Sequence, residues 1–149
     1  MLDYKINDHL QRLVRCFNGL KNIRKRPKSE FLVIDFLQAS SERYLKLAIE
    51  SCMNIGNSII LLEQFNKKIP TSRTNADIFI VLSKIGVIDE HFSFELIRMI
   101  ELYNRLEHIY WNINKEEMYN IIQTNLGNFK KFIECVIQYY NKKYKVHCA

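Results

Sequence analysis

The sequence predicts an all-α fold, an up-and-down bundle of five or six helices, from three observations. The 149 residues include four Gly and two Pro, fewer turn residues than an all-β chain of this length usually needs. Apolar side chains recur at three- and four-residue steps along the chain, which is the helical period. The composition, 48% hydrophobic and 26% charged, is that of a globular protein. We expect one domain over residues 1–149.

The N-terminal part predicts two helices separated by a proline. Leu10, Leu13 and Leu20 belong to the apolar face of a helix over about residues 3–25, which Pro27 ends. Ser29 is the expected N-cap of a short second helix over residues 30–38. The apolar run at residues 31–34 also fits a strand, but no second run is available to pair with it, so a helix is favoured.

The longest helix is expected over about residues 40–65. Its buried stripe consists of Leu45, Ala48, Ile49, Cys52, Ile55, Ile59, Ile60 and Leu62. A different face carries Arg43, Glu50, Asn54 and Asn57, again at helical steps. A solvent-facing side is the usual explanation of such a polar row, and the wall of a cleft is the alternative.

The remaining helices are predicted from residue types that favour helix ends. A capping box should start a short helix, and a glycine should end it. An aspartate should cap the helix after that one, which we expect to end near residues 110–112. An asparagine with a glutamate three residues later should start the last helix. These residues are Thr74 with Asp77, Gly86, Asp89, and Asn114 with Glu117.

The net charge of +6 is concentrated at the two ends of the chain. Residues 1–28 hold eight basic and two acidic side chains, and residues 142–149 add three lysines, whereas the segment between holds 11 basic and 14 acidic side chains. A basic end can approach a polyanion such as RNA, and a solvated surface that keeps the protein soluble is an equally good explanation.

Membrane, export and cofactor signals are missing from the sequence. No run approaches 18 uninterrupted apolar residues, and residues 1–10 are too polar for a signal peptide, so we expect a cytoplasmic protein without a membrane segment. The four cysteines are far apart and are expected to be buried free thiols rather than two disulfides. No phosphate-binding glycine loop, metal-spaced histidine pair, Gly-x-Ser-x-Gly or Cys-x-x-Cys occurs, so we expect no metal and no cofactor.

One segment, residues 103–114, concentrates chemically active side chains near the end of a helix. Asn104 and His108 are four residues apart and therefore neighbours, while Arg105 shares a face with His108 and with Arg98 two turns earlier. A helix C-terminus favours the imidazolium form of a histidine. Taken alone, one histidine in a polar turn is an ordinary feature. Tyr110 and the sole tryptophan complete the segment.

This segment resembles the signature of the HepT-like proteins, a toxin branch of the HEPN superfamily of helical RNases. The family typically reads Arg-Asn-Arg-Leu-Val-His-x-Tyr where this chain reads Tyr-Asn-Arg-Leu-Glu-His-Ile-Tyr. Residues 41–57 are similar to the family's long second-helix motif, residues 70–88 to its middle, and residues 112–129 to its final helix. The resemblance covers about residues 30–140 and implies a HEPN-like helical bundle.

The resemblance implies metal-independent RNA cleavage in a cleft between two copies of the chain. His108 would act as general acid or base, Asn104 would contact the ribose or phosphate, and Arg105 would stabilise the developing charge. Arg98 and Arg43 are the expected RNA-binding residues. The family also implies a small nucleotidyltransferase antitoxin that attaches AMP to Tyr110, which would add negative charge beside the RNA site.

The sequence departs from the family pattern at the arginine that precedes the histidine. Glu101, Leu102 and Tyr103 occupy the positions at the family's spacing, and Tyr103 is the closest match. Arg105 and Arg98 are the two candidates to substitute for this arginine, although helical geometry puts Tyr103 on a different face from Arg105. Glu107 also stands where the family usually has an apolar residue.

Three interpretations therefore remain open. The chain is an RNase toxin that uses Asn104, Arg105 and His108; or a degenerate relative that binds RNA or an antitoxin without cutting; or a helical adaptor in which Tyr103 packs in the core and His108 is incidental. The first two are nearly level, and the third is well behind them because Asn-x-x-x-His-x-Tyr is intact.

Overall fold

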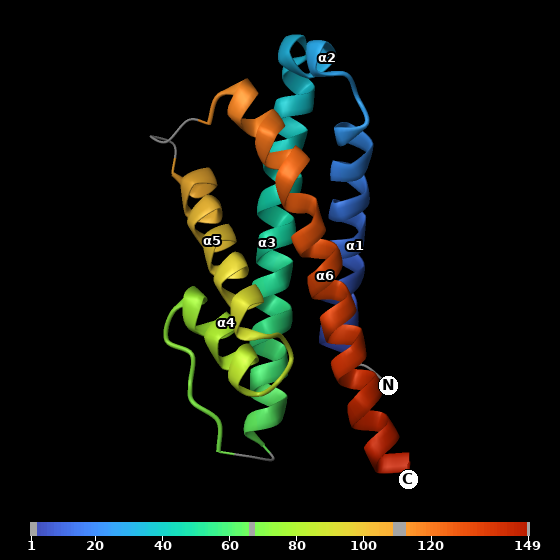
Figure 1. Ribbon diagram of the computed structural model, residues 1–149, viewed down its shortest axis with the longest axis vertical. Coiled ribbons are helices and arrows are strands. Elements are labelled where there is room, and N and C mark those ends of the chain that lie inside the picture. Colours follow the sequence, from blue (N-terminus) through green and yellow to red (C-terminus); the bar gives the residue numbers. More distant parts are fainter. Residues whose placement is uncertain (1–2, 66–67, 109–112, 149) are drawn as a thin grey trace.

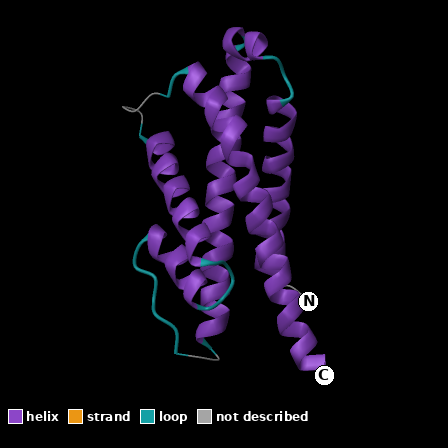
Figure 2. Ribbon diagram, in the orientation of Figure 1, coloured by secondary structure: helices purple, strands orange, loops and turns teal. Residues whose placement is uncertain are grey.

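The computed structural model is an all-helical bundle, which confirms the predicted fold class (Figures 1 and 2). It describes residues 3–65, 68–108 and 113–148, and no strand occurs within those ranges. The helices are α1 (Tyr4–Arg24), α2 (Lys28–Val33), α3 (Asp35–Gln64), α4 (Asn75–Lys84), α5 (Glu90–Glu107) and α6 (Lys115–Cys148).

Helix α3 is the centre of the bundle. It contacts each of the other five helices, and Figure 1 shows it between α1 on one side and α4 and α5 on the other, with α6 crossing the bundle. Leu45, Ile55 and Ile59 on its inner face are fully buried. Among the described residues α3 is the one helix long and apolar enough to cross a membrane, with a mean hydropathy of 1.3, but 56% of that stretch is buried inside the protein, as in a core helix.

The capping residues predicted for α4, α5 and α6 are confirmed. Thr74 Oγ1 accepts a hydrogen bond from the backbone N–H of Asp77 at 3.2 Å, and Asp77 Oδ2 accepts one from the N–H of Thr74 at 3.1 Å, which forms the capping box of α4. Gly86 follows α4 with φ of +87°, a left-handed conformation that glycine adopts without strain. Asp89 Oδ1 accepts from the N–H of Phe92 at 2.7 Å at the start of α5. Asn114 caps α6 in the same way, at 2.8 Å from the N–H of Glu117.

The expected helix over residues 30–38 is wrong in its bounds. Helix α2 begins at Lys28, with Pro27 rather than Ser29 at its N-cap, and the chain breaks at Ile34 (φ −93°, ψ 101°) before α3 starts at Asp35. Phe31 and Leu37 are both buried, yet six residues of continuous helix would rotate them onto different faces. The break at Ile34 lets both side chains enter the core, and it makes α3 begin five residues earlier than expected.

The end of α5 and the burial of the cysteines differ in part from the sequence predictions. Helix α5 ends at Glu107 rather than near residues 110–112, and residues 109–112 lie outside the described part of the chain. Cys16 and Cys52 are buried free thiols, as predicted, whereas Cys135 is a free thiol that is only half-buried. Burial raises the pKa of the Cys52 thiol, so it stays protonated and acts as an apolar group.

Candidate active site

The predicted histidine stands at the C-terminal end of α5. His108 is the C-cap residue, and its backbone N–H donates to the carbonyl of Asn104 at 3.3 Å. Both residues are exposed at the last turn of the helix. The chain is thus folded so that Asn104 and His108 share one exposed turn, as their spacing predicts. Tyr110 and Trp111 lie outside the described residues.

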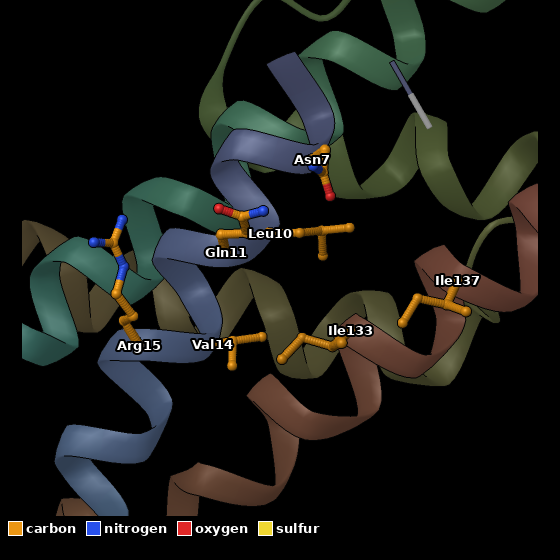
Figure 3. A pocket seen from close by; sticks show the side chains of 7 residues that line it. All are labelled: Asn7, Leu10, Gln11, Val14, Arg15, Ile133 and Ile137. Carbon is orange, nitrogen blue, oxygen red and sulfur yellow. The ribbon is translucent and has the colours of Figure 1, made fainter. Parts of the chain in front are cut away.

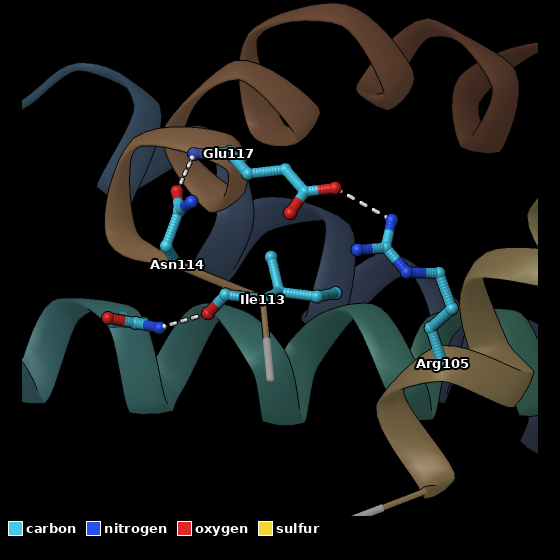
Figure 4. Close-up of polar contacts among 5 residues, drawn as sticks. Arg105, Ile113, Asn114 and Glu117 are labelled. Atoms are coloured by element: carbon cyan, nitrogen blue, oxygen red, sulfur yellow. Dashed lines mark hydrogen bonds and ion pairs between the residues drawn. The ribbon is translucent and has the colours of Figure 1, made fainter. Parts of the chain in front are cut away.

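Arg105 points away from this turn towards α6. Its Nη1 donates to Glu117 Oε1 at 2.7 Å, and this hydrogen bond holds the pKa of the Glu117 carboxyl below its ordinary value (Figure 4). The backbone N–H of Glu117 is itself bound by Asn114. Gln38 of α3 donates to the carbonyl of Ile113 at 2.9 Å, which fixes the same stretch to the core. Arg105 therefore joins the end of α5 to the start of α6.

Tyr103 occupies the opposite side, against α3. Its hydroxyl donates to Glu50 Oε1 at 2.9 Å, and the ring is half-buried. Burial, together with the carboxylates of Glu50 and Glu107, raises the pKa of Tyr103, so the hydroxyl remains a donor at neutral pH. Tyr103 and Arg105 thus lie on different faces of α5, as helical geometry predicts. Glu50, in the polar row of α3, meets α5 rather than open solvent.

A cation that sequence reasoning missed also lies against this end of α5. Lys46 Nζ of α3 is 2.9 Å from Glu107 Oε1. The hydrogen bond from Lys46 lowers the pKa of the Glu107 carboxyl, and the same bond raises the pKa of Lys46. The sequence held two signals, the unusual glutamate before His108 and the four-residue spacing of Lys46 and Glu50, but only the fold brings α3 and α5 together.

The two arginines expected to bind RNA have different surroundings. Arg43 is exposed on α3, three residues before Lys46, and its charge acts on Lys46. Arg98 is 73% exposed on α5, and its Nη1 lies 3.3 Å from Glu95 Oε1 one turn earlier. The structure therefore brings Arg43 to the α3 side of the candidate site, whereas Arg98 lies on the outer surface, two turns before Arg105.

An apolar groove lies elsewhere, between α1 and α6 (Figure 3). It has a volume of about 560 Å³ and contains no predicted site residue. Its lining residues are Asn7, Leu10, Gln11, Val14, Arg15, Ile133 and Ile137. In the described ranges, no group of three or more His, Cys, Asp and Glu side chains is placed to hold a metal ion.

The fold is similar to those of several solved helical proteins, HEPN toxins among them. A Shewanella oneidensis HEPN toxin, tri-AMPylated and in complex with its MNT antitoxin, is 23% identical with a TM-score of 0.80, over 92% of this chain and 99% of that one. A toxin–antitoxin complex with AMP-PNP gives 23% identity and a TM-score of 0.78, over 91% and 99% of the two chains. YutE of Bacillus subtilis, a cytosolic protein of unknown function, is 18% identical with a TM-score of 0.73, over 92% of both chains.

The sequence comparisons define the family. Residues 6–136 match the family described as Ribonuclease HepT-like, and the chain belongs to it. The match includes α1, so it begins earlier than the resemblance over residues 30–140 suggested. The mRNA nuclease HepT of Shewanella oneidensis is 30% identical over 122 residues, which is 82% of this chain and 88% of that protein.

Proposed function

We propose that this chain is the toxin of a cytoplasmic toxin–antitoxin pair, and that it cleaves RNA without a metal in a cleft between two copies of itself. One observation carries the proposal: in a member of the Ribonuclease HepT-like family, the last turn of α5 holds Asn104 and His108 together at exposed positions. The relative described as an mRNA nuclease supports RNA as the substrate class.

The chemistry requires a proton carrier and charge stabilisation. His108 would take the proton from a ribose 2′-hydroxyl, whose oxygen attacks the adjacent phosphorus, or return a proton to the leaving 5′-oxygen. Such general acid–base catalysis typically contributes ~10²–10⁴-fold. Asn104 would hydrogen-bond the ribose or the phosphate, and the guanidinium of Arg105 would stabilise the charge of the transition state once it exchanges Glu117 for the phosphate. Arg43 and Arg98, both exposed, would bind flanking phosphates.

The antitoxin partner is proposed from the solved relatives. Two of them are toxin–antitoxin complexes, and one of these toxins is tri-AMPylated. A nucleotidyltransferase antitoxin would place AMP on the hydroxyl of Tyr110, two residues after His108. The added phosphate would repel an RNA phosphate at the site and so inhibit cleavage.

A second candidate function, RNA or antitoxin binding without cleavage, is favoured by two contacts. Tyr103, at the position where the family has an arginine, donates to Glu50, and Arg105 is already paired with Glu117. Tyr103 supplies no positive charge beside His108, and Glu117 neutralises that of Arg105. The adaptor interpretation has weaker support, because the Tyr103 hydroxyl binds a carboxylate rather than packing only among apolar groups.

The decisive experiment incubates purified protein with RNA in EDTA and compares wild type with His108→Ala. His91→Ala is the matched control, since His91 is exposed at the other end of the same helix. We expect cleavage by wild type and His91→Ala and none by His108→Ala. Binding without cleavage by the wild type would favour the second function. If the wild type neither binds nor cleaves RNA, the proposal is refuted.

A further inference from the structure

Neither Tyr103 nor Arg105 directs a positive charge to the α3 side of the turn that holds Asn104 and His108. The Tyr103 hydroxyl is neutral and is turned to Glu50 at 2.9 Å, on the α3 side of α5. The Arg105 guanidinium is turned to Glu117 at 2.7 Å, on the α6 side. Asn104 and His108 therefore stand between a neutral hydroxyl and a guanidinium that points to the α6 side, so a positive charge on the α3 side of this turn has to come from another helix.

Lys46 of α3 is in the right place. Lys46 binds Glu107, which directly precedes His108 and lies three residues after Asn104. The side chains of Asn104, Glu107 and His108 therefore all leave the last turn of α5. The Glu107 carboxylate interacts electrostatically with both Lys46 and His108. Lys46 and Glu107 keep 40% and 38% of their side chains exposed, so the ammonium group is open to solvent and to a ligand.

Arg43 adds a second positive charge to the same surface. It precedes Lys46 by three residues, about one helical turn, and its charge acts on Lys46. Two cations of α3 thus line the surface that leads to the exposed turn of α5. A single-stranded RNA that enters the site over α3 would meet Arg43 first and Lys46 next to the reacting phosphate.

The ion pair with Glu107 does not prevent this role. Half-exposed ion pairs contribute little net free energy, because both partners lose solvation and side-chain freedom when they pair. A phosphate oxygen is a strong acceptor for an ammonium group, and lysine is a common phosphate ligand that acts as a point charge. Glu107 keeps the Lys46 ammonium beside the site until RNA replaces its carboxylate.

We propose that Lys46, with Arg43 behind it, forms a phosphate-binding subsite that supplies the positive charge absent from position 103. This inference rests on the proposed RNA function. It makes Lys46 a residue that touches the substrate phosphate, and it assigns Glu107 the positioning of Lys46.

The test measures RNA binding and cleavage by Lys46→Ala, Lys46→Arg and Lys84→Ala over a range of salt concentrations. Lys84 is the matched control because it is an exposed lysine on α4. We expect Lys46→Ala to lower binding or cleavage on the order of tenfold and to reduce the salt slope for single-stranded RNA by about 0.7. Lys46→Arg should keep most of the activity, and Lys84→Ala should match wild type.

A second comparison tests the ion pair between Lys46 and Glu107 through its effect on RNA binding. Glu107→Gln keeps an oxygen that can accept a hydrogen bond from Lys46 but removes the competing negative charge, so it should strengthen RNA binding. The gain should shrink in a Lys46→Ala background, because no ammonium is there to release. Circular dichroism of each variant checks that it is folded. If wild type binds RNA while Lys46→Ala behaves like Lys84→Ala, the subsite is refuted and the proposed function stands. If wild type neither binds nor cleaves RNA, both are refuted.

Discussion

Gly56 allows α4 to approach α3 closely, and adding one methyl group there should destabilise the protein. A Cβ at Gly56 would lie 2.4 Å from Ile78 Cγ2 and 3.2 Å from Leu82 Cδ1. Ordinary contacts between carbon atoms are about 3.5–4.0 Å, so α4 would have to move by about 1 Å or the buried Ile78 would have to change rotamer. Overpacking of this kind typically costs about 1–3 kcal/mol.

The helix propensity of alanine works in the opposite direction, and a matched variant removes it. Alanine is favoured over glycine by about 1 kcal/mol in a helix interior. Gly127 lies inside α6, is exposed, and has no atom within 4 Å of an added Cβ. Gly127→Ala should therefore stabilise the protein by about 1 kcal/mol. The difference between the two variants isolates the packing cost, about 1–3 kcal/mol.

Urea denaturation followed by circular dichroism at equal protein concentration gives both free energies of unfolding. We expect Gly56→Ala to unfold at lower urea than Gly127→Ala, with similar denaturant slopes. Equal stability of the two variants would refute the close packing of α3 on α4. A lower stability of Gly127→Ala than wild type would refute the use of alanine propensity as the common reference.

Three more predictions concern individual contacts. Tyr103→Phe removes the hydrogen bond to the α3 carboxylate and should lower the free energy of unfolding by about 1–2 kcal/mol; unchanged stability in urea would mean that the bond contributes nothing. A double-mutant cycle of Arg105→Ala and Glu117→Gln should give a coupling energy of about 0.2–1 kcal/mol, since both side chains are partly exposed. A coupling energy of zero would mean that this ion pair does not stabilise the contact between α5 and α6. Hydrogen bonds from the backbone N–H groups of Arg73 and Thr74 lower the pKa of the Asp77 carboxyl from 3.8. The ionised Asp77 carboxylate therefore stabilises the fold at neutral pH, and this stabilisation is lost as the pH falls through the lowered pKa. Urea unfolding of Asp77→Asn should therefore differ more from wild type at pH 7 than at pH 3, and an equal difference at both would contradict this.

Local signals made most of the fold predictable. Thr74 with Asp77, Asp89, and Asn114 with Glu117 were recognised because a cap depends on residues within one turn of each other. The break at Ile34 was missed because no proline or glycine marks it. The break lets Leu37 enter the core together with Phe31, which packs against Tyr119 of α6 with ring centroids 5.6 Å apart, and local periodicity does not reveal such contacts between helices.

The candidate site was predictable only within α5. Asn104 and His108 share a turn because they are four residues apart. Tyr103 and Arg105 lie on different faces because they are two residues apart. The partners of these residues were not predictable, because Glu50 and Lys46 come from α3 and Glu117 from α6. A single sequence gives the face on which a side chain stands, and the packing of helices decides which side chain it meets.

The two departures from the family pattern, at positions 103 and 107, are best understood together. An arginine at 103 would carry its own positive charge to the site, whereas a tyrosine there is neutral and donates to Glu50. A glutamate at 107 looks unfavourable beside an RNA phosphate when α5 is considered alone. In the folded chain, this carboxylate binds the ammonium group of Lys46 at 2.9 Å and so brings a cation from α3 to the same turn. The positive charge that position 103 lacks is thus available from the neighbouring helix, which is why the missing arginine does not by itself argue against phosphate chemistry at His108.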